Sequence, residues 1–147
     1  MSSLLVVLSV GVHALVMREL YDRLCYAGRL VWLRLSLIVL ILLLAHSLQI
    51  VMFGLAYHLM GDPPNGLAGV YDGSLTDALY FSAAVYTTVG FGDITPSGYL
   101  RLLVSFEALL GLVLIAWSAS FTFVAMSRLA KPGSNADHDD REAGDNG

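Results

Sequence analysis

The sequence predicts an all-α membrane protein. Hydrophobic side chains make up 56% of the 147 residues, and the mean hydropathy of +0.70 is too high for an ordinary soluble domain. Two apolar runs, at residues 35–59 and 100–126, each exceed the ~20 residues that cross a bilayer core. The lipid bilayer is therefore the expected surrounding, and the net charge of −4 gives no reason to expect nucleic acid.

A third apolar segment occupies residues 1–20. Between residues 3 and 17 it is interrupted only by Gly11 and His13. It lacks the positive start and the small-residue cleavage pattern of a signal peptide. We expect an additional N-terminal helix, which either crosses the membrane or lies in its interface.

The charges outside the apolar runs predict the orientation. A basic linker at residues 21–32 lies within the stretch 18–34, which carries four arginines, and Arg128 and Lys131 follow the last run. The segment from residue 58 to residue 80 carries three aspartates and neither lysine nor arginine. The positive-inside rule then places the linker and the C-terminus in the cytoplasm, and the acidic loop and the N-terminus outside. Residues 128–147 form an acidic stretch without apolar periodicity, which we expect to be a disordered cytoplasmic tail.

The segment Thr87-Thr88-Val89-Gly90-Phe91-Gly92-Asp93 is the most informative part of the chain. Its two glycines adopt backbone angles that other residues resist, so successive carbonyls can turn to one side. The hydroxyl of Thr88 adds one more oxygen to this row. A hydrated cation gives up its water only where oxygens surround it, and one strand covers one side. This chemistry requires several copies of the segment around an axis.

The segment resembles the selectivity filter of potassium channels, in which Thr-Val-Gly-Tyr-Gly loops coordinate the ion with carbonyls. The resemblance covers roughly the last two-thirds of the chain, with Phe91 in place of the tyrosine. It implies a homotetramer that binds potassium, the permeant ion, at Thr88, Val89, Gly90 and Phe91, with Gly92 supplying backbone freedom. It implies no cofactor, no small-molecule substrate and no enzymatic activity. The implied pore domain at 33–127 has an outer helix at 33–59, an outer loop at 60–74, a pore helix at 75–87, a filter at 88–93 and an inner helix at 99–127.

The residues before the filter predict a short helix that does not cross the membrane. Ser74 fits the N-cap position, with Asp77 three residues later. The stretch 75–87 is too short to span a bilayer, so it resembles the re-entrant pore helix of the family. Such a helix points its C-terminal end, which carries partial negative charge, toward the pore centre, and this favours a cation there.

Three residues are candidates for supporting the filter and its outer mouth: Tyr80, Thr87 and Asp93. The resemblance implies a hydrogen-bond donor at Tyr80 for the acid at Asp93, which braces the filter from behind. The alternative is that the aromatic side chains of the pore helix simply pack. Asp93 also raises the local cation concentration at the mouth.

The two long helices carry two further candidate features. Gly111 is either a gating hinge, as the resemblance implies, or a point of close approach between helices. Glu107 is an ionisable group within a span, and His46 and Gln49 are polar residues of the outer helix. We expect these three to form an intramembrane hydrogen-bonded network, which is either structural or a proton-sensitive gating element.

Two other functions are open on the same scaffold. One is a less selective monovalent cation channel, which Phe91 disfavours because an acidic residue near the filter glycines is typical of those relatives. The other is a non-conducting membrane subunit, which the intact filter sequence disfavours. The expected location is the plasma membrane of a prokaryote.

Overall fold

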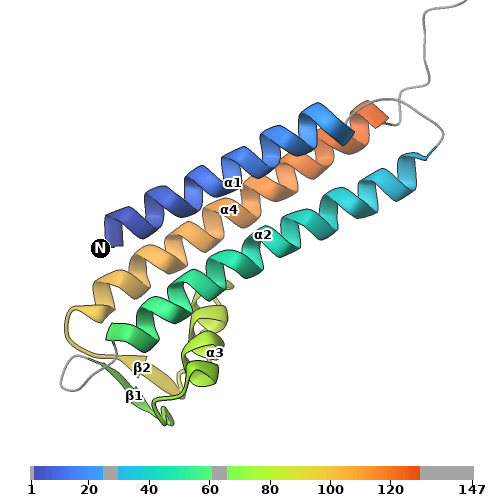
Figure 1. Ribbon diagram of the computed structural model, residues 1–147. Coiled ribbons are helices and arrows are strands. Elements are labelled where there is room, and N and C mark those ends of the chain that lie inside the picture. The colour runs from blue at the N-terminus through green and yellow to red at the C-terminus, as the bar shows by residue number, and fades with distance from the viewer. Residues whose placement is uncertain (1, 25–29, 61–65, 130–147) are drawn as a thin grey trace, which may run out of the picture.

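The computed structural model describes residues 2–24, 30–60 and 66–129. In this part of the chain four helices account for nearly all regular structure (Figure 1). Residues 25–29 of the basic linker, which include Cys25, and the acidic tail from residue 130 lie outside it. The elements in chain order are α1 (Ser2–Leu24), α2 (Val31–Met60), β1 (Leu67–Gly69), α3 (Leu75–Tyr86), β2 (Ile94–Pro96) and α4 (Leu100–Leu129).

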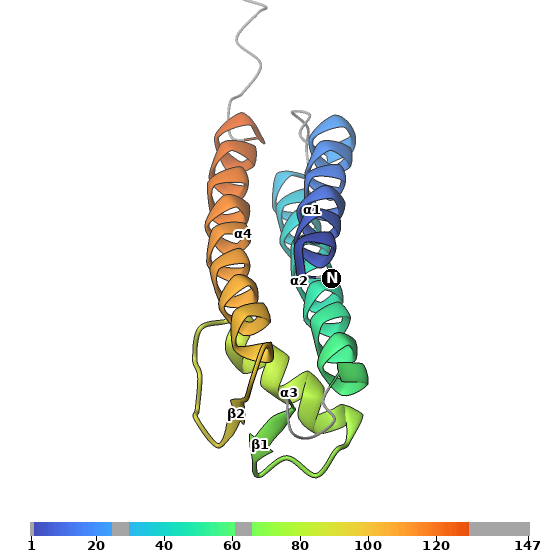
Figure 2. The ribbon, with the colours of Figure 1, turned by 90° about the vertical axis from the view of Figure 1, so that its left-hand side faces the viewer.

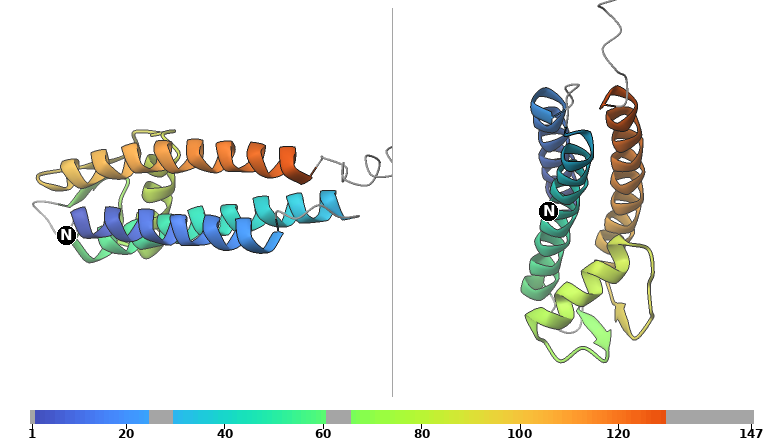
Figure 3. Two further views of the ribbon diagram at one scale, coloured as in Figure 1. Left: turned by 90° about the horizontal axis from the view of Figure 1, so that it is seen from above. Right: turned by 90° about the vertical axis from the view of Figure 1, so that its right-hand side faces the viewer.

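Three of the described helices are long and apolar enough to cross a membrane. They cover Ser3–Leu24, Val31–Met60 and Leu100–Leu129, and they run side by side as a bundle (Figures 1 and 3). Large apolar side chains stay exposed along their outer faces, such as Leu4 at 69%, Leu109 at 60% and Phe123 at 65%. An apolar surface of this extent suits lipid rather than water.

The first helix is longer than the sequence predicted. It continues to Leu24, so Arg18 and Arg23 lie on its last turns rather than in a linker. Arg23 Nε lies 2.8 Å from Glu19 Oε2, and Arg18 Nε lies 3.9 Å from Asp22 Oδ2. These exposed pairs follow the i, i+4 spacing of a helix face and contribute little to stability.

The short helix α3 crosses one end of the bundle between α2 and α4 (Figure 2). Ser74 is its N-cap, with its hydroxyl accepting a hydrogen bond from the Asp77 amide at 3.1 Å. The helix ends at Tyr86, one residue before the predicted end. Its buried face packs in one core cluster with Phe53 of α2 and Leu103 of α4. A second cluster, at the other end of the bundle, joins α1 to α2 and α4.

A two-stranded sheet was not predicted in the outer loop. Strands β1 and β2 pair antiparallel, with Gly69 opposite Ile94. The Val70 amide donates to the Asp93 carbonyl at 3.0 Å. Gly69 has φ +97°, and a Cβ there would lie 2.1 Å from the Asp93 carbonyl oxygen, so only glycine fits. The sheet ties the outer loop to the end of the 88–93 segment.

Gly111 is a point of close helix approach. A Cβ on this residue of α4 would lie 2.1 Å from the carbonyl oxygen of Tyr86 and 2.9 Å from its carbonyl carbon. Of the two expected roles, the structure has the close approach, because the end of α3 rests on the α4 backbone at this residue. A hinge at Gly111 stays a prediction.

The contact at Gly111 predicts a loss of stability in Gly111→Ala. The added methyl group must push the end of α3 away from α4, and overpacking of this kind costs ~1–3 kcal/mol. Gly11→Ala in α1 is the matched control, because its Cβ would meet nothing within 4 Å. Thermal unfolding of the two purified variants in detergent, followed by circular dichroism, should show a lower midpoint for Gly111→Ala alone. Equal midpoints would contradict the close approach.

Candidate functional site

The segment 87–93 leaves α3 with a backbone that alternates in hand. Thr88, Gly90 and Gly92 have φ values of +60°, +53° and +82°, whereas the residues between them do not lie in this region. A chain of alternating left- and right-handed residues turns its N–H groups to one side and its carbonyls to the other. The amides of Thr88 and Gly90 donate to the carbonyls of Val85 and Ala84, at 2.9 and 3.0 Å. The amide side therefore faces α3, and the carbonyl side faces away from it.

Thr88 is the unexpected member of this alternation. A β-branched residue at positive φ is a genuine outlier, because its Cβ crowds the backbone. Such strain persists where the surroundings impose it, and it is concentrated at functional sites. The glycines at positions 90 and 92 predicted the positive φ there. The residue type at position 88 did not predict it.

The carbonyl side of the segment is open in a single chain. Val89 is 56% exposed and Phe91 is 67% exposed, and residues 87–93 as a whole are exposed. Irregular backbone at membrane depth is tolerated only where protein or a water-filled cavity surrounds it. One chain thus forms one side of a site, and the other sides must come from atoms outside this chain.

Tyr80 braces the outer end of the segment from the surface of α3. Its hydroxyl donates to Asp93 Oδ2 at 2.9 Å, as expected. Its ring stacks on Phe91, with the ring centroids 5.9 Å apart and an interplanar angle of 8°. The hydrogen bond to Asp93 raises the pKa of Tyr80, so the phenol stays protonated across the neutral range. Thr87 has a different role, because its hydroxyl donates to the Ala83 carbonyl at 2.7 Å and closes the end of α3.

Glu107 is fully buried where α2, α3 and α4 meet. The Tyr57 hydroxyl donates to its Oε2 atom, and the Ser82 hydroxyl lies 2.6 Å from its Oε1 atom. The prediction that Glu107 shares a network with His46 and Gln49 is therefore wrong. Because α2 and α4 run antiparallel, Glu107 lies level with Tyr57 near the end of α2, and His46, eleven residues earlier, lies level with Ser118.

The hydrogen atoms around Glu107 can be counted. Ser82 has a single hydroxyl hydrogen, yet its oxygen lies 2.9 Å from the Ile50 carbonyl as well as 2.6 Å from Glu107 Oε1. A carbonyl oxygen only accepts. All three groups are satisfied when Ser82 donates to Ile50 and the neutral acid of Glu107 donates to Ser82. In this arrangement Glu107 links α2, α3 and α4, as a structural network would, and a proton-sensitive gating role stays a prediction.

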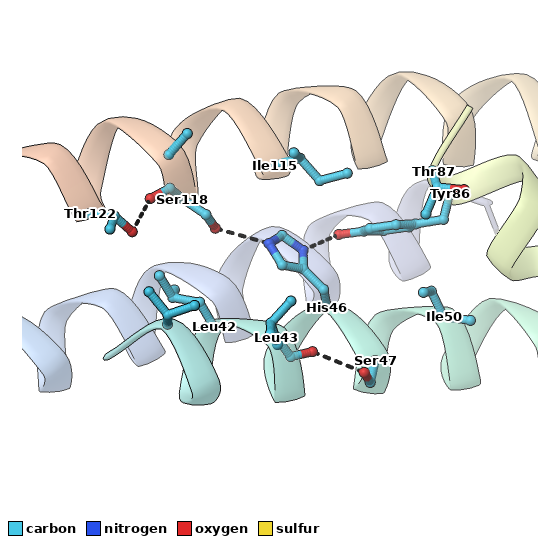
Figure 4. Close-up of a pocket in the computed structure, with 12 residues that line it drawn as sticks. Leu42, Leu43, His46, Ser47, Ile50, Tyr86, Thr87, Ile115, Ser118 and Thr122 are labelled. Carbon is cyan, nitrogen blue, oxygen red and sulfur yellow. Dashed lines mark hydrogen bonds between the residues drawn. The ribbon is translucent and has the colours of Figure 1, made fainter. Parts of the chain in front are cut away.

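His46 and Gln49 belong to a second network in the middle of the bundle. His46 Nδ1 lies 2.8 Å from the Tyr86 hydroxyl, and His46 Nε2 lies 3.0 Å from the Ser118 hydroxyl (Figure 4). A cavity of ≈ 400 Å³ with mostly apolar lining lies beside these groups, between α2 and α4. His13 of α1 also joins this network. His13 was not among the site residues predicted from the sequence, although a single ionisable side chain within an apolar run indicates a buried polar contact.

Known proteins share sequence with the part of the chain that contains the 87–93 segment. A family model described as "Ion channel" matches residues 37–128, which is more than half of the chain and excludes α1. The chain is 37% identical over 78 residues to "Inward rectifier potassium channel Kirbac3.1" of Paramagnetospirillum magnetotacticum, which is 52% of this chain and 25% of that protein. It is 38% identical over 60 residues to "Protein LctB" of Geobacillus stearothermophilus, which is 41% of this chain and 45% of that protein. The chain thus spans a quarter of one relative and under half of the other. No solved structure matches.

The hydrogen count at Glu107 predicts how two substitutions differ. Glu107→Gln keeps the shape and can still donate to Ser82 and accept from Tyr57, so the stability should change little. Glu107→Leu leaves the buried hydroxyl of Tyr57 without its acceptor, at a cost of ~1–3 kcal/mol. Thermal unfolding of the purified protein in detergent at neutral pH measures both. A Glu107→Gln variant as unstable as Glu107→Leu would show that the ionised form is needed.

Proposed function

Because the chain belongs to the ion-channel family, we propose that it is a potassium-selective channel whose pore is formed by four copies around a common axis. Conduction is passive, and the chain has no enzymatic role. The observation that carries the proposal is the alternating backbone of residues 88–92, which holds its amides against α3 and frees its carbonyls.

The incomplete coordination in one chain supports a tetramer. In potassium channels, four loops supply the carbonyl oxygens that replace the hydration shell of the ion. Here the carbonyls of Thr88, Val89, Gly90 and Phe91 would provide one quarter of each such ring. The exposed side chains of Val89 and Phe91 would be covered by neighbouring chains.

Three observations favour potassium over other ions. One relative is named as an inward rectifier potassium channel. No acidic residue lies between Gly90 and Gly92, where less selective relatives of this scaffold tend to carry one. The C-terminal end of α3 directs its partial negative charge toward the segment, which favours a cation.

The charges of the bundle support the proposed orientation in the plasma membrane. Arg18, Arg23, Arg34 and Arg128 lie toward the end of the bundle where α1 and α4 finish and α2 begins (Figure 1). Asp72 of the outer loop and Asp77 of α3 lie at the opposite end. The positive-inside rule then places the arginine end and the C-terminus in the cytoplasm of a prokaryote, with the mouth beside Asp93 outside.

Potassium flux into liposomes that contain the purified protein tests the proposal. Gly90→Ala should reduce the flux to the background of empty liposomes, because a Cβ at φ +53° costs ~1–2 kcal/mol in each copy. Gly73→Ala is the matched control, since Gly73 also has a positive φ, +87°, with open space around it, but lies outside the filter. The control should conduct.

Equal flux from wild type and Gly90→Ala would contradict a carbonyl filter at this position. Equal permeation of sodium and potassium would indicate the less selective channel. A wild type that is folded and silent would indicate a non-conducting subunit.

The brace at the outer mouth predicts the effect of Tyr80→Phe. This change removes the hydrogen bond to Asp93 and keeps the ring that stacks on Phe91. The filter loses one charge-assisted hydrogen bond in each copy, so the reversal potential in mixed potassium and sodium should move toward that of a non-selective pore. Tyr99→Phe, at an exposed tyrosine beside the start of α4, is the control and should leave the reversal potential unchanged. An unchanged reversal potential in Tyr80→Phe would remove the brace from the mechanism.

A further inference from the structure

Five side chains from all four described helices form a closed ring of hydrogen bonds in the bundle. Two distances join α1 to its neighbours: Gln49 Nε2 to His13 Nδ1 at 3.3 Å, and His13 Nε2 to Ser118 Oγ at 2.9 Å. Ser118 Oγ continues to His46 Nε2 at 3.0 Å, and His46 Nδ1 to Tyr86 Oη at 2.8 Å. Tyr86 closes the ring by donating to Gln49 Oε1. His13, Gln49 and Tyr86 are almost completely buried.

A main-chain carbonyl fixes the positions of the hydrogens in this ring. Gln49 Nε2 lies 3.2 Å from the carbonyl oxygen of Ser9, which only accepts, so the amide nitrogen must face it. The same nitrogen faces His13 Nδ1, which must then accept. His13 is therefore neutral, with its hydrogen on Nε2, and it donates to Ser118.

The remaining bonds follow in the same direction around the ring. Since the hydrogen of Tyr86 points to Gln49, the oxygen of Tyr86 accepts from His46, which therefore carries its hydrogen on Nδ1. Ser118 then donates to His46 Nε2. Each of the five groups donates once and accepts once within the ring, and both imidazoles are neutral.

A proton on His13 is incompatible with the closed ring. It would bind at Nδ1 and place an N–H group against the N–H group of Gln49 in a buried site, where an unpaired donor is costly. A flip of the Gln49 amide would relieve this clash, but it would turn the amide oxygen toward the Ser9 carbonyl and remove the acceptor of Tyr86. Protonation of His46 at Nε2 costs only the donation from Ser118. His13 is thus the group that decides whether the ring can close.

The other titratable groups around His13 are few in the part of the chain that the structure describes. On α2 the ring of His46 lies 4.9 Å away between centroids, so a charge on one imidazole disfavours a charge on the other. On α3 the group is Tyr86, which already belongs to the ring. On α4 the group is Glu107, whose oxygens are engaged by Tyr57 and Ser82. Neither His13 nor His46 therefore meets a carboxylate that would hold a proton.

We propose that this ring is a proton-binding site that latches α1 to the pore helix. With His13 neutral the latch is closed, and α1 is tied to Tyr86, the last residue of α3 before the filter. With His13 protonated the latch opens, and the pore helix loses this support. Acid should therefore reduce potassium flux. The flux effect rests on the proposed function, whereas the ring does not.

Nitrogen NMR of the full chain in lipid bilayers, with ¹⁵N-labelled histidine, tests the ring without any need for conduction. Above neutral pH, His13 should show the tautomer with hydrogen on Nε2, and His46 the tautomer with hydrogen on Nδ1. The variants His13→Gln and His46→Gln assign the signals, and His58→Gln removes the signal of the exposed His58. A hydrogen on Nδ1 of His13 above neutral pH would overturn the proposal.

Potassium flux from pH ~8 to ~4 tests the latch, and the range extends below that of a free imidazole because the closed ring disfavours a proton on His13. Wild type should lose flux about fivefold, the factor that corresponds to one net hydrogen bond of ~1 kcal/mol. His13→Gln should lose this acid response, and His58→Gln should keep it. Ser118→Ala, which breaks the ring from α4 and spares His13, should move the response to higher pH and gives a second result if His13→Gln does not fold.

The outcomes separate the two proposals. A protein that shows the predicted tautomers but conducts under no condition retains the ring and refutes the channel. A protein that conducts with the same acid response in wild type and His13→Gln refutes the latch and retains the channel.

Discussion

A polar backbone segment at membrane depth must be held by protein on one side and left free on the other, and this constraint organises the molecule. Helix α3 is too short to cross a bilayer, so α2 and α4 must bury it. Its last carbonyls, those of Ala84 and Val85, are then used by the amides of Gly90 and Thr88. Within the described part of the chain, the carbonyls of residues 88–91 accept no main-chain hydrogen bond. Residues such as Gly54 and Gly111 matter because they let α3 approach α2 and α4 closely.

The polar side chains of the bundle serve the same purpose at two levels. Near the outer end, Glu107 of α4 joins Tyr57 of α2 to Ser82 of α3. Eleven residues away on each long helix, His46 of α2 bonds both Tyr86, at the end of α3, and Ser118 of α4. In lipid, the hydrophobic effect does not drive two apolar helices together in one register. Close packing and interhelical hydrogen bonds must therefore fix the register. Both groups of polar side chains bond to α3, one at Ser82 in its second half and one at Tyr86, its last residue.

Local patterns in the sequence predicted what depends on local physics. The long apolar runs predicted the spans, and Ser74 predicted the start of α3. Gly90 and Gly92 predicted backbone angles that other residues resist. Register between helices has no such signature, so the partners of Glu107 were predicted wrongly. Strands of three residues are too short for a period, which is why β1 and β2 were missed. Thr88 adopts its strained φ because the carbonyls of Val85 and Ala84 hold its own amide and the amide of Gly90, and no residue pattern encodes that.

The extra helix α1 is explained by the way in which it is attached. The family match begins after it, at residue 37, so α1 is an addition to a scaffold that needs two spans and a pore helix. Near its C-terminal end it packs through apolar side chains such as Met17 and Leu20, which lipid could replace at little cost. At its middle it offers Ser9 and His13, which lipid cannot replace because their partners are buried polar groups. The specific part of the attachment is therefore polar and centred on an ionisable residue. In the proposed latch, such a helix is bound firmly in one protonation state and less firmly in the other, and the ring that holds it includes Tyr86, the residue before the 87–93 segment.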